Sequence, residues 1–225
     1  MLVKICGLSN VLDARCATAS GATALGFVMG GKVLPVEVEP HAQTVRDIIR
    51  ELPKSIETFV VTHLFDPDDI VELTEYVHAS GIQISENIGV DAVRKVREMT
   101  SKRIIKTVVA GGDDCFERLK SYEPFCDFIL LDSYVAGYVG GTGATSDWVV
   151  CKKLIDSASK PVFLAGGLTP DNLERAIRST NPDGVDVSTG VSTYCPEYLR
   201  KDRKDPAKIG AFISIARSFA RDAVS

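Results

Sequence analysis

Short apolar runs alternate with amphipathic stretches along the whole chain, and this alternation constrains the fold more than any other feature. Eight runs rich in β-branched and aromatic residues are expected to form strands: Leu2–Ile5, Leu25–Val28, Thr58–Thr62, Gly81–Ile84, Ile104–Val109, Phe128–Leu131, Pro161–Leu164 and Gly184–Val187. Helical spacing of apolar residues follows each run, over Val11–Ser20, His41–Glu51, Pro67–Ser80, Asp91–Thr100, Cys115–Ser121, Trp148–Ser159, Pro170–Ser179 and Pro206–Ala220. Eight such units in 225 residues predict a single (β/α)8 TIM barrel over residues 1–225, with a doubly wound open sheet as the alternative.

The net charge and the cysteines indicate which partners are excluded and in which compartment the protein works. A net charge of −4 offers no general attraction for nucleic acid or an anionic membrane, and no apolar run is long enough to span a bilayer. The apolar stretch at the amino terminus contains Lys4 and is too short for a signal peptide. Six cysteines are scattered without a CxxC pair, which predicts reduced thiols in the cytoplasm and no metal site.

The first strand carries a lysine and a cysteine that point the same way. Strand side chains alternate, so Lys4 and Cys6 share one face while Val3 and Ile5 share the other. Inside a parallel barrel, the carboxyl end of a strand is where chemistry takes place. A neighbouring ammonium also favours the reactive thiolate form of cysteine. The alternative is a small buried cysteine that only fills the core.

Two aspartates lie in or after apolar strands. Asp132 closes the run 128–132, and Asp186 lies between two valines. A buried carboxylate is costly unless it is paired or takes part in chemistry, so each is a candidate site residue or a structural acid that caps a loop. His63 ends the third strand and is expected near the mouth of the barrel, whereas His41 and His78 are expected on helix surfaces.

Glycine-bearing segments follow the last three expected strands. Glycine lets backbone N–H groups approach an anion closely, and the loops after strands seven and eight are the usual phosphate site of a TIM barrel. The pattern therefore predicts a barrel of the phosphate-binding type, with a phosphorylated ligand held by Gly141, Gly143, Gly166, Gly167, Ser188, Thr189 and Gly190.

A polar loop longer than the usual connection follows the eighth strand. Residues 192–204 read STYCPEYLRKDRK, which is charged and lacks a helical or strand period. The segment is either a solvated insertion or a flap over the mouth of the barrel.

Together, these residues resemble the phosphoribosylanthranilate isomerase family of tryptophan biosynthesis. The resemblance runs nearly end to end and is carried by Lys4-Ile5-Cys6-Gly7-Leu8, Gly26-Phe27-Val28, Leu130-Leu131-Asp132, Gly140-Gly141-Thr142-Gly143 with Asp147-Trp148, the run from Phe163 to Asn172, the run from Gly184 to Val191, and Lys204-Asp205. The start of the chain, the LLD run and the GGTG run are its most specific parts.

The resemblance implies an Amadori rearrangement of an N-linked ribose phosphate to a 1-deoxyribulose phosphate. It implies that Asp132 is the general acid and Cys6 the general base, and that no metal or organic cofactor is needed. Lys4 is expected to supply thiolate character to Cys6. Other residues expected to line the substrate site are Lys4, Lys32, Gln83 and Asp186. The protein is expected to act on a small phosphorylated substrate as a monomer or homodimer.

The chain departs from the family at the end of the site that receives the aromatic acid. Val36 stands where the family places an arginine for the anthranilate carboxylate, Ser85 replaces a histidine, and Ser192 replaces a glutamate. Arginine is the natural bidentate partner of a carboxylate, so Lys32, Arg200 or Arg203 is a candidate replacement. Two alternatives therefore stand beside the isomerase: a related barrel isomerase or lyase for a different phosphorylated sugar conjugate, and a binding protein without catalysis.

Overall fold

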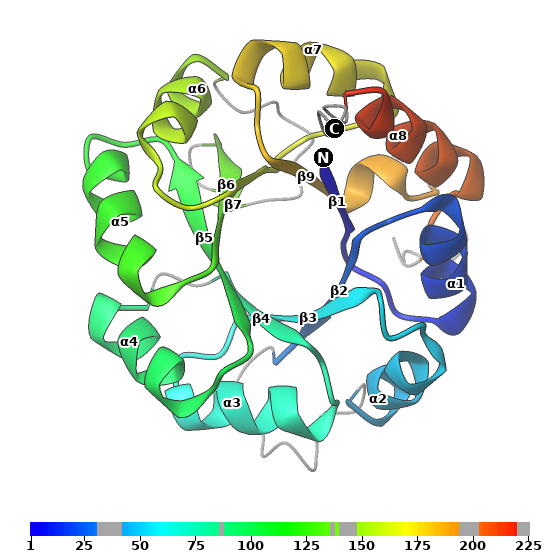
Figure 1. Ribbon diagram of the computed structural model, residues 1–225, viewed down its shortest axis with the longest axis horizontal. Helices are drawn as coiled ribbons and strands as arrows, with labels where there is room; N and C mark the ends of the chain where they lie inside the picture. Colours follow the sequence, from blue (N-terminus) through cyan, green and yellow to red (C-terminus); the bar gives the residue numbers. More distant parts are fainter. Residues whose placement is uncertain (31–41, 86–87, 136–137, 140–147, 194–202, 220–225) are drawn as a thin grey trace, which may run out of the picture.

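The strands of the computed structural model close into a parallel barrel (Figure 1). The structure describes residues 1–30, 42–85, 88–135, 138–139, 148–193 and 203–219. Within these ranges β9 pairs in parallel with β1, and β5 pairs with β6, so the ladder has no open edge. The barrel strands are β1 (Leu2–Ile5), β2 (Ala24–Met29), β3 (Glu57–Thr62), β4 (Gly81–Ile84), β5 (Arg103–Ala110), β6 (Phe128–Val135), β8 (Val162–Leu164) and β9 (Gly184–Val187). The predicted TIM barrel is confirmed over the open sheet.

The helices form an outer ring around these strands (Figure 1). Asp66 and Asp205 accept hydrogen bonds from backbone N–H groups at the first turns of α3 and α8, and a proline follows each of them, so both helix starts are well defined. The helices are α1 (Val11–Ser20), α2 (Ala42–Glu51), α3 (Pro67–Tyr76), α4 (Val90–Met99), α5 (Cys115–Tyr122), α6 (Trp148–Ser157), α7 (Pro170–Thr180) and α8 (Pro206–Ser218), with short 3-10 turns η2 (Glu123–Phe125) and η3 (Thr189–Val191).

Alternation along the strands builds two separate cores. Outward-facing residues such as Val3 and Ile5 join a large cluster between the barrel and the helices. Inward-facing residues form a smaller cluster inside the barrel, where the rings of Phe128 and Phe163 meet edge to face at 5.6 Å. This inner cluster fills part of the barrel interior, and two of its members, Leu130 and Ala165, border the cavity described below.

Two local features differ from the expectation. Helix α3 ends at Tyr76 rather than Ser80, and His78 lies beyond it with a positive φ of 60° instead of on a helix. The side chain of Ser80 bonds the backbone N–H and C=O of Thr58, which turns the chain into β4. A short strand, β7 (Tyr138–Val139), pairs antiparallel with the end of β6 and extends that strand past its expected end.

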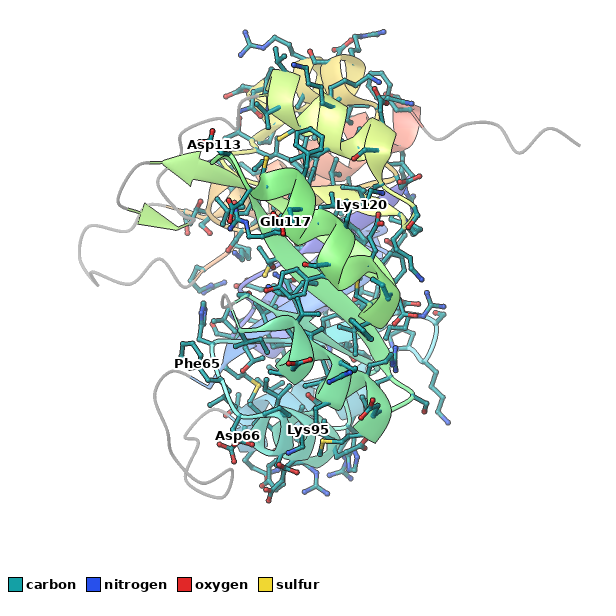
Figure 2. All side chains as sticks on the ribbon, turned by 90° about the vertical axis from the view of Figure 1, so that its left-hand side faces the viewer. Phe65, Asp66, Lys95, Asp113, Glu117 and Lys120 are labelled. Carbon is teal, nitrogen blue, oxygen red and sulfur yellow. The ribbon has the colours of Figure 1, made fainter. Side chains whose placement is uncertain are left out.

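The mouth of the barrel lies at one end of the molecule. In Figure 2, Phe65 and Asp113, which follow β3 and β5, lie toward the left-hand end, and Lys120 on α5 lies farther from it. The two ends of the polar loop are held together, because Ser192 and Lys204 form an antiparallel bridge and Thr193 N–H donates to Arg203 C=O at 2.9 Å. Residues 194–202 lie outside the described residues, so the full insertion at 192–204 stays a prediction. None of the described helices is long and apolar enough to cross a membrane.

Candidate active site

A cavity of about 410 Å³ opens at the carboxyl ends of the barrel strands. It is lined by residues of β2, β3, β4, β5, β6 and β9 and of the segments that follow β1, β3, β4, β8 and β9. Of the residues expected in the site, it brings together Cys6, Gln83, Asp132, Gly166, Gly167, Asp186, Ser188, Thr189 and Gly190. Lys32, Gly141 and Gly143 lie outside the described residues.

Cys6 lies just beyond the last residue of β1, where its backbone N–H donates to Val187 C=O at 2.8 Å. The thiol fits there because Gly26, on the neighbouring strand, carries no side chain. A Cβ atom at position 26 would lie 2.9 Å from Cys6 Sγ and 2.9 Å from Lys4 Nζ. Gly26 therefore determines how deeply the thiol sits in the barrel wall.

Substituting Gly26 by alanine is expected to lower kcat by about tenfold or more, because small displacements of a reacting group are costly in rate. The added methyl group must push aside Cys6 Sγ or the fully buried Lys4 Nζ. The measurement is kcat with thermal unfolding as a check on folding, and Gly210→Ala on α8 is the control because nothing lies within 4 Å of a Cβ there. An unchanged kcat in a folded Gly26→Ala variant would contradict this role.

Lys4 lies beneath Cys6 and forms an ion pair with Asp186. The two residues are direct neighbours in the β1–β9 register, and Lys4 Nζ donates to Asp186 Oδ1 at 2.7 Å. Burial by itself lowers the pKa of Lys4, but the charges of Asp186 and Cys6 raise that pKa above its ordinary value. The expectation that Lys4 lines the substrate site is corrected: its side chain is fully buried and does not line the cavity.

Lys4 acts on the thiol in the expected direction, but its effect is outweighed. The charge of Lys4 and a hydrogen bond from it do lower the pKa of Cys6. Desolvation by burial is the larger effect, and the Asp186 carboxylate acts in the same direction, so the pKa of the Cys6 thiol is raised above its ordinary value. The thiolate of the free protein is therefore favoured by alkaline pH, and any cation near Cys6 matters for its formation.

Asp132 reaches the same cavity from β6, a strand that is not adjacent to β1. It pairs in the β5–β6 register with Val109, and its side chain is half-buried. Strand β6 thus presents a carboxyl group to the cavity that Cys6 also lines. This arrangement supplies two titratable groups on different walls of one cavity.

Polar residues on β4 and just after β3 and β4 complete the cavity wall. Gln83 is buried, and its Nε2 donates to Thr107 Oγ1 at 3.4 Å, whereas its Oε1 has no hydrogen-bond partner among the described residues. A buried carbonyl oxygen at a cavity wall is a ready acceptor for a ligand hydroxyl or N–H group. Ser85 lines the cavity as well, and the exposed His63 lies on its rim as expected.

The loops after β8 and β9 meet along the same wall. Gly166 and Gly167 both have positive φ angles, of 84° and 63°, and Asn172 Nδ2 donates to Gly167 C=O at 2.9 Å. Gly190 packs so closely against this loop that a Cβ there would lie 1.8 Å from the Leu168 carbonyl oxygen. The two glycine-bearing segments therefore lie side by side, and both border the cavity.

Replacing Gly167 by valine is expected to weaken the binding of a phosphorylated ligand by about tenfold or more, since the side chain blocks backbone approach and disfavours the positive φ. The measurement is calorimetric affinity for ribulose 5-phosphate. The control is Gly112→Val, which has a similar strain at φ 82° in the segment after β5 and does not line the cavity. Equal affinity of Gly167→Val and the parent would refute a phosphate site at this loop.

Residues that sequence reasoning missed in the site include Lys204 and Gly26. Lys204 is buried, and its Nζ donates to the carbonyl oxygen of Ser188 at 3.0 Å. The one signal for it in the sequence is the Lys204-Asp205 pair before the last helix, which says nothing about where the ammonium points. Among the described residues, no group of three histidine, cysteine or acidic side chains is arranged to hold a metal ion.

The fold and the site define a class of protein: a TIM-barrel enzyme with a thiol, a carboxyl group and two glycine loops around one cavity. The model of the N-(5'-phosphoribosyl)anthranilate isomerase family matches residues 3–214. An isomerase of that name from Desulforudis audaxviator is 38% identical over 220 residues, covering 96% of this chain and 98% of the relative. The corresponding protein of Pseudomonas aeruginosa is 37% identical, with 98% and 97% covered.

Solved structures agree with this match. The crystal structure of phosphoribosyl anthranilate isomerase from Thermotoga maritima has a TM-score of 0.81 and 31% identity, and the alignment covers 97% of this chain and 99% of that one. A complex of such an isomerase with reduced 1-(o-carboxyphenylamino)-1-deoxyribulose 5-phosphate has a TM-score of 0.78 and 30% identity, with 97% and 100% covered. The chain belongs to the N-(5'-phosphoribosyl)anthranilate isomerase family.

Proposed function

We propose that this chain catalyses the Amadori rearrangement of N-(5'-phosphoribosyl)anthranilate to 1-(2-carboxyphenylamino)-1-deoxyribulose 5-phosphate in tryptophan biosynthesis. The observation that carries the proposal is the single cavity that joins Cys6 and Asp132 to the glycine loops after β8 and β9. Family membership over residues 3–214 supports the same reaction. The rearrangement needs one general acid and one general base, and Asp132 and Cys6 can fill these two roles.

In the proposed mechanism, Asp132 donates a proton to the ring oxygen of the ribose, and the C1–O bond breaks to give an open-chain Schiff base. The Cys6 thiolate then removes the proton from C2, which leaves an enolamine that tautomerises to the ketone. General acid–base steps of this kind typically contribute about a hundredfold to ten-thousandfold each to the rate. Cys6 and Asp132 line the same cavity from separate parts of the barrel, so each group can reach a different atom of one substrate.

The glycine loops are proposed to hold the phosphate and thereby fix the sugar. Backbone N–H groups around Gly166, Gly167 and Ser188 to Gly190 border the cavity beside Cys6. A dianion held at this wall would leave the sugar ring between the thiol and the carboxyl group. Gln83 is proposed as a hydrogen-bond partner of the substrate because its buried Oε1 is unpartnered among the described residues. Asp186 is proposed to act mainly through its pair with Lys4.

The alternative is a related isomerase or lyase for a different phosphorylated sugar conjugate. It is favoured by Ser85 at the cavity wall, where the family usually has histidine, and by Val36 in place of the usual arginine, although residue 36 lies outside the described residues. The aromatic end of the substrate is where the two functions differ, because the phosphate end and both titratable groups suit either one.

The test that separates these functions is growth complementation. A bacterial strain that lacks its own phosphoribosylanthranilate isomerase is supplied with this chain and plated without tryptophan. We expect growth with the parent chain and none with Cys6→Ser at equal protein level. Absence of growth with well-folded, well-expressed parent protein would contradict the proposed substrate and favour the alternative.

We further propose that the enzyme works in the cytoplasm as a monomer or homodimer, without a nucleic-acid or membrane partner. The five described cysteines are free thiols, which is compatible with a reducing compartment. One structural relative is described as monomers generated from a dimeric isomerase of Thermotoga maritima, so both states exist in the family. The molar mass in solution, measured by light scattering, decides between them.

A further inference from the structure

Lys204 is a buried lysine at the end of the polar loop, and the proposed mechanism does not use it. Its side chain and backbone lie among β9, the segment after it, and α1. The residue is 4% exposed, and its backbone N–H donates to Asp13 Oδ2 at 3.0 Å. Taking an ammonium group out of water costs free energy, so a buried lysine is expected to have compensating interactions.

The ammonium group is held in place by two oxygen atoms near the cavity. Lys204 Nζ donates to the backbone carbonyl of Ser188 at 3.0 Å and to Ser192 Oγ at 3.3 Å. It also lies beside the residue that follows Cys6, since a Cβ on Gly7 would be 3.4 Å from Lys204 Nζ. These contacts fix a positive charge next to the cysteine end of the cavity.

Among the residues that the structure describes, no carboxylate forms an ion pair with this ammonium group. Lys4 is paired with Asp186, and the oxygen atoms that Lys204 Nζ contacts among the described residues are neutral. Asp13 accepts from the backbone of Lys204 and lies 3.9 Å from Arg203 Nε. Asp132 and His63 are the other titratable groups that line the cavity. A thiolate at Cys6 would supply the missing negative charge.

We propose that Lys204 is a positioning residue for catalysis, whose buried ammonium group stabilises the thiolate form of Cys6. The proposal rests on the proposed role of Cys6 as the base. The proposal also gives a role to the bridge between Ser192 and Lys204. This bridge places Lys204 beside Ser188, near the Cys6 thiol.

The electrostatics of the site support this geometry. Burial lowers the pKa of Lys204 below its ordinary value, and the charges of Cys6, Asp186 and Asp13 oppose this shift, so the ammonium form depends on its anionic neighbours. Reciprocally, the charge of Lys204 lowers the pKa of Cys6 against the larger effect of burial. Linkage of this kind is mutual: removal of the cation must raise the pKa of the thiol.

The experiment measures the ionisation of Cys6 directly in the full-length protein. The ultraviolet absorbance of the thiolate is recorded against pH, and the Cys6→Ser form of each variant is subtracted so that the other cysteines and the tyrosines cancel. Lys204→Met is compared with the parent, with Lys204→Arg, and with Lys208→Met. Lys208 is the matched control because its Nζ contacts the Ser192 carbonyl at 3.2 Å but is exposed to solvent.

We expect Lys204→Met to move the titration midpoint of Cys6 to higher pH by about one unit or more, and the kcat–pH profile to move the same way. Lys204→Arg and Lys208→Met should leave the midpoint close to the parent value. No shift in folded Lys204→Met, or an equal shift in Lys208→Met, would overturn the proposal. If Lys204→Met does not fold, Ser192→Glu supplies the test, because a carboxylate there should neutralise the ammonium group and raise the midpoint, and an unchanged midpoint would overturn the proposal.

The outcome is separable from that of the proposed function. The titration needs no substrate, so a shift in a protein that fails to convert N-(5'-phosphoribosyl)anthranilate would refute the substrate and leave the electrostatic role of Lys204 in place. A parent enzyme that is active, with a midpoint insensitive to Lys204→Met, would refute the role of Lys204 alone.

Discussion

Replacing Cys6 by serine is expected to lower kcat for N-(5'-phosphoribosyl)anthranilate by about a hundredfold or more, because a hydroxyl group is a far weaker base than a thiolate. Cys6 is 5% exposed and borders the cavity beside the loop that contains Ser188. Serine is smaller than cysteine, so the substitution fits the space that Gly26 leaves. The measurement is steady-state turnover together with the calorimetric affinity for ribulose 5-phosphate, which should survive.

The matched control is Cys16→Ser on α1, a half-buried cysteine that does not border the cavity. Its turnover should equal that of the parent. Turnover of Cys6→Ser at the parent rate would remove Cys6 from the mechanism, whereas equal losses in both variants would point to instability instead of chemistry.

Asp132→Asn is expected to have a loss of similar size, about a hundredfold or more in kcat, since an amide cannot donate the proton that opens the ribose ring. The substitution keeps the shape of the side chain on β6 and removes only its acidity. The loss should appear in kcat with little change in the affinity for ribulose 5-phosphate, because the glycine loops proposed to hold the phosphate follow β8 and β9.

Asp113→Asn serves as the control for this variant. Asp113 is an exposed aspartate in the segment after β5, at the mouth end of the barrel (Figure 2), and it does not line the cavity. We expect parent-like turnover from it. A rate for Asp132→Asn within a factor of about two of the parent would show that ring opening does not depend on this carboxyl group.

Much of the barrel can be predicted from the chain because its strands are short apolar runs with clear ends. The bounds of β1, β4 and β9 agree with the sequence prediction residue by residue, as do those of α1. The alternation in Leu2–Ile5 also places Lys4 and Cys6 inside the barrel correctly. Local periodicity determines which way a strand side chain points, so this part of the site follows from the sequence.

The parts that could not be predicted depend on contacts between distant positions. Lys4 and Asp186 are 182 positions apart, and their buried ion pair keeps Lys4 out of the cavity lining. The net pKa of Cys6 depends on how thoroughly the barrel desolvates it, which no local pattern reveals. Lys204 ends a charged run that is typical of a solvated surface, yet its bridge to Ser192 holds its side chain in a buried position.

The most direct test of the proposed function is turnover of freshly generated N-(5'-phosphoribosyl)anthranilate by the purified full-length chain, followed by the loss of anthranilate-type fluorescence. We expect a normal enzymatic rate that collapses in Cys6→Ser and persists in Cys16→Ser. A folded parent protein that binds ribulose 5-phosphate and yet leaves this substrate unchanged would contradict the proposed function and show that the barrel acts on another sugar phosphate.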